Sequence, residues 1–175
     1  MKIYPITRWF ALVLVLTLGA AAGCIRSGPE EVAARGDVLT IVVSEAKEMG
    51  EVVYTVGEQS FAIAPLGEGM TLALVKVRVI NPKSTRVTLT LDEEAVFLIG
   101  TGEEEFHPLN PGLRAVESSA LAPKGNPYSS HLWGQIQVLQ GYEVTGWFFF
   151  EVPVGSKFAA FAWEDVETIM VYYSP

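Results

Sequence analysis

The chain has 175 residues, 50% of them hydrophobic, so it is long enough to bury one substantial core. It carries 12 Lys and Arg against 20 Asp and Glu, a net charge of −8. This balance argues against a nucleic-acid partner, because binding to phosphates requires a basic surface. The single cysteine excludes a disulfide within the chain.

Residues 1–23 have the composition of a secretory signal peptide. Lys2 and Arg8 precede an uninterrupted apolar run over residues 9–18, and small residues then lead to Cys24. The stretch from residue 9 to residue 23 is shorter than the ~20 apolar residues that a membrane-spanning helix needs. We therefore treat residues 1–23 as a targeting segment rather than as part of the fold.

Residues 21–24, Ala-Ala-Gly-Cys, resemble the lipobox of bacterial lipoproteins, although that family most often has Leu where Ala21 stands. The resemblance implies cleavage before Cys24 and a diacylglyceryl group on its sulfur. The alternative is an unmodified thiol at the end of the signal peptide. Cleavage would remove two basic residues and no acidic ones, giving a net charge of −10. So acidic a protein does not adhere to anionic lipid by charge, which makes the lipid on Cys24 the expected membrane contact.

The mature chain begins with a polar tether and continues as short strands. Residues 24–37 are small, polar and charged, and predict a tether reaching at most ~40 Å. From residue 38 onward, runs of β-branched and alternating apolar residues between turn signals predict strands. These strands are expected at 38–43, 52–56, 60–64, 70–81, 86–91, 95–99, 130–138, 144–152, 158–163 and 168–173.

Two segments interrupt this series of strands. Residues 45–50 are too short to nucleate a helix and predict a turn or excursion. Residues 108–126 contain three prolines and are the least regular part of the chain. Their apolar residues have a spacing that fits one or two helical turns between 113 and 121.

The clearest alternation lies between Gly69 and Pro82. Every second residue belongs to one apolar face: Ala73, Val75, Val77 and Val79. The other face starts apolar and ends charged: Met70, Leu72, Leu74, Lys76 and Arg78. This pattern predicts a central strand whose first half is buried on both faces and whose second half is buried on one. We therefore predict an all-β fold, a single immunoglobulin-like antiparallel β-sandwich over residues 38–175.

Three stretches carry a family resemblance: residues 74–82 (LVKVRVINP), 96–100 (VFLIG) and 141–153 (GYEVTGWFFFEVP). In this order they resemble the telokin-like, immunoprotective-extracellular type of immunoglobulin-like domain found in bacterial surface lipoproteins. The resemblance covers roughly residues 38–173, and the chain departs from it most around 108–126. It implies a fold and a surface location, and that family has no agreed activity.

Catalytic chemistry finds little support in the sequence. Ser129, Ser130 and His131 are adjacent, but neighbours on a strand point to opposite sides, and no motif surrounds them. A Ser–His hydrolase requires an oriented base and an oxyanion hole. We predict no catalytic residues and a protein that is not an enzyme.

Metal binding is the next alternative. The acidic runs 92–94 and 103–105 bracket one strand and could offer carboxylates to Ca²⁺, but they are expected at opposite ends of it. His107 and His131 show no clustered pattern with the methionines that would suit copper. We therefore predict no metal site and no cofactor.

The aromatic strand 144–152 offers the best candidate surface. If Phe148 and Phe150 point inward, then Trp147 and Phe149 point outward, and Trp133 lies on the polar side of its own strand. Large exposed aromatic side chains are typical of partner surfaces. The alternative is that residues 108–126 or the strand near 60–65 cover them.

We therefore predict a non-catalytic, lipid-anchored, extracytoplasmic module that binds an envelope or extracellular protein. The alternative function is a surface-anchored module that binds a metal or a small ligand.

Overall fold

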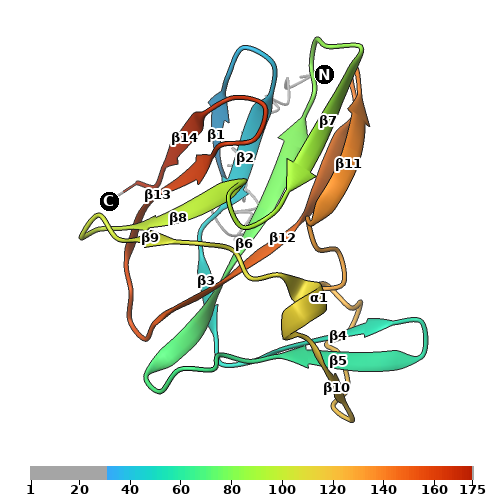
Figure 1. Cartoon of the computed structure of the whole chain (residues 1–175), viewed down its shortest axis with the longest axis vertical. Helices are drawn as coiled ribbons and strands as arrows, with labels where there is room; N and C mark the ends of the chain where they lie inside the picture. Colours follow the sequence, from blue (N-terminus) through green and yellow to red (C-terminus); the bar gives the residue numbers. More distant parts are fainter. Residues whose placement is uncertain (1–30, 175) are drawn as a thin grey trace, which may run out of the picture.

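The computed structural model describes residues 31–174, so the predicted signal peptide and Cys24 lie outside the described residues. The described chain is an antiparallel β-sandwich (Figure 1). Its elements are β1 (Glu31–Arg35), β2 (Thr40–Ser44), β3 (Lys47–Met49), β4 (Val52–Val56), β5 (Gln59–Ile63), β6 (Met70–Ile80), β7 (Arg86–Leu91), β8 (Val96–Gly100), β9 (Glu105–Phe106), α1 (Pro111–Arg114), β10 (Val116–Ser118), β11 (Gly134–Leu139), β12 (Glu143–Pro153), β13 (Phe158–Trp163) and β14 (Ile169–Tyr172).

Strand β6 is the centre of the largest sheet, as its alternation predicts. It pairs with β12 along its whole length, and with β2 and β3 on its other edge. β1 extends this sheet beyond β2. All these pairings are antiparallel.

The two faces of β6 belong to two separate cores, which confirms the prediction that its first half is buried on both sides. The alternating face from Ala73 to Val79 packs in the main core. That core lies between the large sheet and two smaller sheets, β7–β11 and β14–β13–β8–β9. Leu72 and Leu74 on the other face belong to a second core, closed by the β4–β5 hairpin. Lys76 is exposed where this second cover ends.

Buried Asn81 stops β6 and ties three segments together. Its side-chain amide donates to the carbonyls of Ser84 and Val138, at 2.7 and 2.9 Å, and its Oδ1 accepts from the Ser84 amide. A fully buried amide of this kind must have its hydrogen bonds satisfied. Asn81 therefore has a structural role, holding the turn that follows β6 against β11.

A fourth sheet, of three strands, covers the outer face of β6 and β12. It has the order β10–β5–β4, and its third strand comes from the proline-rich segment (Figure 1). That segment was predicted to hold one or two helical turns from 113 to 121, but it forms the single turn α1 followed by β10. Asn110 caps α1 and Pro111 starts it, whereas Ala115 is already extended and leads the chain onto the free edge of β5.

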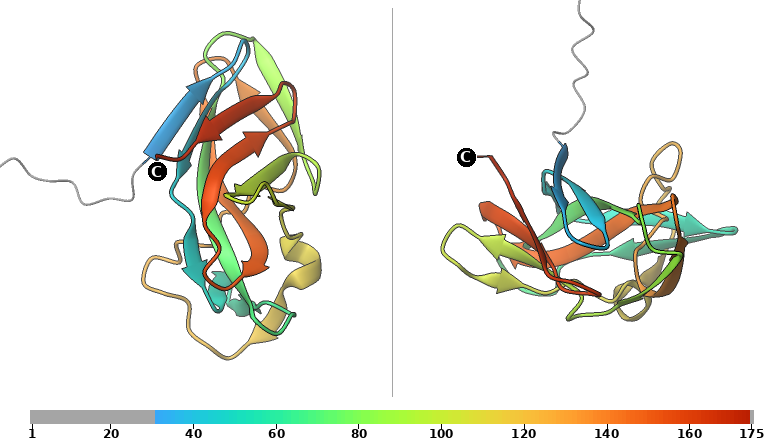
Figure 2. Two further views of the ribbon diagram at one scale, coloured as in Figure 1. Left: turned by 90° about the vertical axis from the view of Figure 1, so that its left-hand side faces the viewer. Right: turned by 90° about the horizontal axis from the view of Figure 1, so that it is seen from above.

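Part of the predicted tether is a strand of the domain. β1 lies within residues 24–37, where a tether was expected, and Figure 2 shows the β1–β2 hairpin beside the β13–β14 pair. Val32 and Ala34 alternate toward the main core, which is why this short polar segment becomes a strand. The Glu167 carboxylate, reaching over from the turn before β14, accepts hydrogen bonds from the backbone amides of residues 37, 38 and 39.

Two further boundaries differ from the prediction. Residues 47–49 form strand β3 against β6, where a turn or excursion was expected. The strand predicted at 130–138 begins only at Gly134, whose φ of 77° lies in the left-handed region and interrupts the alternation. Residues 130–132 instead run beside β12, with the Trp147 amide donating to the Ser130 carbonyl at 2.8 Å.

Glu151 fixes the proline-rich segment to the end of β12. Its carboxylate accepts from the Leu66 and Gly67 amides at 2.8 Å each and from the Arg114 guanidinium at 2.7 Å. Burial acts to raise the pKa of Glu151, but the hydrogen bonds from Gly67, Arg114 and Leu66 outweigh it and lower the pKa below its ordinary value. The carboxylate is therefore held in its charged form as a structural clamp.

Candidate functional site

The middle of the aromatic strand β12, from Phe148 to Phe150, is buried on both faces. Phe148 and Phe150 point into the main core, as predicted. Phe149 was expected to be exposed, and this expectation is wrong: it is 1% exposed and belongs to the second core with Tyr54 and Leu74. The cause is the β4–β5–β10 sheet, which covers the face that alternation alone assigns to solvent.

Trp147 is partly covered in the same way. Its indole Nε1 donates to the Pro127 carbonyl at 2.8 Å, and its ring meets the Tyr128 ring edge-on with 5.2 Å between centroids. Trp133 is half-buried. It follows His131, which bridges to Trp147 on β12, and it directly precedes β11, which pairs with β7. The structure therefore brings Trp133 and Trp147 into one region and removes Phe149 from the candidate surface.

His131 serves as a packing group in the second core. Its ring lies between Tyr54 and Phe149, with centroid distances of 4.4 and 5.1 Å. Its Nε2 is shielded from solvent and has no hydrogen-bond partner among the described residues. Burial lowers the pKa of His131, and a hydrogen bond to the Tyr128 backbone offsets this only in part. The neighbouring Ser129 hydroxyl donates to the Asn126 carbonyl rather than to the imidazole.

His131 should make stability depend on pH. Because its folded pKa lies below the ordinary value of 6.5, the unfolded chain takes up a proton near that pH and the folded chain does not. We expect full stability above about pH 6.5 and a progressive loss as the pH falls below it. Replacing His131 with Phe should flatten this dependence in denaturant unfolding between about pH 7.5 and 5.5. The exposed His107→Gln change is the control, and an unchanged slope in the His131 variant would contradict the prediction.

The acidic runs lie at opposite ends of β8, as predicted. His107 returns along β9 to the first run, where its Nδ1 lies 3.0 Å from the Glu93 carbonyl oxygen and 4.0 Å from a Glu94 carboxylate oxygen. The second run turns at the far end, where the Gly100 amide donates to the Glu104 carbonyl at 2.8 Å. Among residues 31–174, no three His, Cys, Asp or Glu side chains gather as a metal-binding group.

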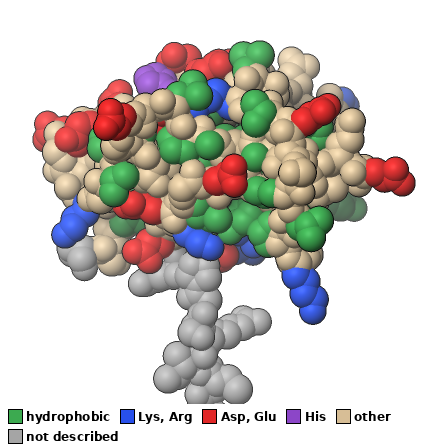
Figure 3. Space-filling model, turned by 90° about the horizontal axis from the view of Figure 1, so that it is seen from below, with side chains coloured by type: hydrophobic (Ala, Val, Ile, Leu, Met, Phe, Trp, Pro, Cys, Tyr) green, Lys and Arg blue, Asp and Glu red, His purple; other side chains and the backbone are tan. Residues whose placement is uncertain are grey.

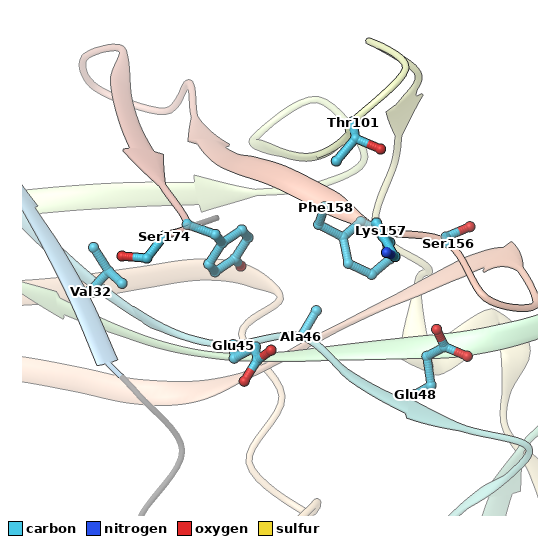
Figure 4. A pocket seen from close by; sticks show the side chains of 10 residues that line it. Val32, Glu45, Ala46, Glu48, Thr101, Ser156, Lys157, Phe158 and Ser174 are labelled. Atoms are coloured by element: carbon cyan, nitrogen blue, oxygen red, sulfur yellow. The ribbon is translucent and has the colours of Figure 1, made fainter.

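A pocket of about 460 Å³ opens at the edge where the large sheet parts from the β14–β13–β8–β9 sheet (Figure 4). Five separate segments line it, so no local motif in the sequence could have indicated it. Its apolar surface comes from Val32, Ala46 and Phe158. Glu45 and Glu48 lie on one side of it, and Lys157 lies beside Phe158 (Figure 4).

Tyr173 also lines this pocket and has an unusual hydroxyl. Its oxygen is shielded from solvent and has no hydrogen-bond partner within the described part of the chain. Burial, and then the negative charge of Glu45, raise the pKa of Tyr173 far above its ordinary value. The hydroxyl is therefore protonated and neutral at any physiological pH, and it is shielded within the wall of the pocket.

A set of exposed apolar side chains lies at the opposite end of the molecule from β1. They come from the loop after β5, from α1, from β10 and from the loop after β10: Leu66, Leu113, Val116 and Leu121. We call this set the apolar end. Leu113 is 80% and Leu121 is 91% exposed. Figure 3 shows hydrophobic side chains over this end of the molecule, with acidic side chains between and around them.

The fold and these surfaces define an antiparallel β-sandwich protein. Within residues 31–174, none of the helical structure is long and apolar enough to cross a membrane. No protein-family model matches the chain. A search of curated proteins also gives no match.

Two solved structures have a similar backbone fold. One is MPT63, a secreted protein from Mycobacterium tuberculosis, with 14% identity and a TM-score of 0.47 over 83% of this chain and 92% of that one. The other is the YcdA protein of Bacillus subtilis, with 11% identity and a TM-score of 0.48. That match covers 83% of this chain and 39% of the Bacillus protein.

Proposed function

We propose that the protein is a non-catalytic β-sandwich module, held on the outer side of a membrane by lipid on Cys24, that binds a protein of the cell envelope. The observation that carries its non-catalytic character is the position of His131. The candidate base is packed between Tyr54 and Phe149, stays neutral, and is not hydrogen-bonded to a serine. Packing in the second core explains the presence of His131 without a catalytic role.

The anchor rests on the apolar run before Cys24 and on the lipobox-like residues 21–24. We expect Cys24→Ser to leave the protein unprocessed or to release it from the membrane fraction, because a thioether-linked diacylglycerol supplies two acyl chains, enough for stable attachment. Cell fractionation with the Ser27→Ala variant as control measures this. Mass spectrometry that finds an unmodified Cys24 at the mature amino terminus would overturn the anchor.

The apolar end is the surface that best suits a protein partner. Its leucines are too exposed to contribute to the core, and several large exposed apolar side chains at one end of a molecule are typical of an interaction site. The exposed carboxylates of Glu68 and Glu117 lie in the same segments, and the whole chain is acidic. The matching partner would therefore present apolar side chains within a basic surface.

Photo-crosslinking on intact cells tests this surface. A photoreactive residue placed at Leu113 or Leu121 should give one discrete crosslinked protein, and the yield should fall with increasing salt. The same residue at Thr88, which is exposed on β7, is the matched control. Equal products from Leu113 and Thr88, or none from either leucine position, would contradict the partner surface.

A further inference from the structure

We propose that the pocket between β1, β3 and β13 binds a small organic ammonium ligand, with its apolar body against Val32, Ala46 and Phe158 and its cation beside Glu45. This inference concerns a different part of the molecule from the apolar end and does not depend on the partner proposed there. It names the class of ligand, an organic ammonium, for the small-ligand binding that was the alternative function predicted from the sequence.

The size and lining of the pocket fit such a ligand. A volume of about 460 Å³ lies within the ordinary range for small-molecule sites, and the lining is divided about evenly between apolar and polar groups. Here the apolar groups come from β1, from the link between β2 and β3, and from the start of β13. The ligand would therefore lie across the edge of the sandwich and contact both layers.

The charge of the lining favours a cation. Two carboxylates, Glu45 and Glu48, face one ammonium, Lys157, and the chain around them is acidic. Glu48 is already used in part, since its carboxylate accepts a long hydrogen bond of 3.4 Å from the Gly155 amide. Within the part of the chain described, Glu45 forms no ion pair with a basic side chain. Glu45 is therefore the carboxylate that is free to pair with a ligand.

The aromatic residues in the lining add to this preference. Phe158 presents a ring to the pocket, and Tyr173 adds a second ring with a neutral, unpaired hydroxyl. Aromatic faces attract ammonium groups, and the attraction grows where water is excluded.

Three probes of similar shape and different charge test the inference: 2-phenylethylamine, 2-phenylethanol and 3-phenylpropanoate. Calorimetric titration of the full chain in detergent micelles should rank the ammonium first, the alcohol second and the carboxylate last. The ammonium should bind about tenfold more tightly than the alcohol, as expected for one cation–π contact and one partly exposed ion pair acting together. NMR shifts on binding should centre on Val32, Ala46 and Phe158.

Matched variants locate the effect. Glu45→Gln should remove most of the preference for the ammonium, while Glu58→Gln, which neutralises an exposed carboxylate in the β4–β5 turn, should not. Both changes are on exposed side chains, so an equal melting temperature shows that the fold is intact. The inference is overturned if the three probes bind alike, if none binds, if the carboxylate binds best, or if Glu58→Gln has the same effect as Glu45→Gln.

Discussion

Truncating either Phe149 or Phe150 to alanine is expected to lower the free energy of unfolding by about 3–5 kcal/mol. These residues are neighbours on β12 and point to opposite faces, yet they are 1% and 0% exposed. Each deletion leaves a cavity, one in the second core and one in the main core. Denaturant unfolding with the exposed Val154→Ala as control measures both losses.

The Phe149 variant tests whether the β4–β5–β10 sheet covers the second face of β12. If β12 had one face open to solvent, Phe149→Ala would cost little, and only the Phe150 variant would unfold early. A midpoint for Phe149→Ala equal to that of the Val154 control would restore Phe149 to the surface and disprove the covering role of the β4–β5–β10 sheet.

Gly146→Val is expected to cost about 3 kcal/mol, because the position has no room for a side chain. A Cβ atom there would lie 2.7 Å from the Ser130 carbonyl oxygen and 2.9 Å from the Leu132 Cγ. The nearest of these is backbone, which cannot move aside without separating residues 130–132 from β12. Thermal unfolding should show a lower midpoint. The fluorescence of Trp147 should also change, because its contacts with Pro127 and Tyr128 would loosen.

Gly50→Val is the matched control for this change. Nothing lies within 4 Å of a Cβ built at Gly50, so the added side chain meets open space. If the two variants unfold alike, then the segment from Ser130 to Leu132 does not pack on β12 as the structure has it.

The residues of the main core could be predicted because the alternation of apolar and polar residues within each strand shows which side chains face inward. Alternation in β6 and β7 states which side chains face inward, and the structure keeps both strands within one residue of their predicted ends. A period of two cannot say, however, whether the second face is also covered. Whether the second face is covered depends on where the β4–β5 hairpin and β10 pack. The sequence of β12 alone does not show this. The burial of Phe149 is the result.

The pocket was beyond sequence reasoning for a related physical reason. Val32 lies in a segment predicted to be a tether, and Glu45 and Glu48 in one predicted to be a turn. Phe158 and Tyr173 are more than a hundred residues further along the chain. Only the approach of β1 to β14, which belong to different sheets, brings these residues together, and this approach is a property of the topology rather than of a spacing.

If Cys24 carries the lipid that we propose, the pairing of β1 with β2 also limits how far the domain can stand from the membrane. With β1 in the sheet, only residues 25–30 separate Cys24 from Glu31, so the free span is at most about 25 Å rather than ~40 Å. A domain anchored in this way would meet other membrane-attached molecules at an effective concentration in the millimolar range. Contacts that look negligible with the released protein in dilute solution would then be nearly saturated at the membrane, and lengthening residues 25–30 should weaken them without changing the domain itself.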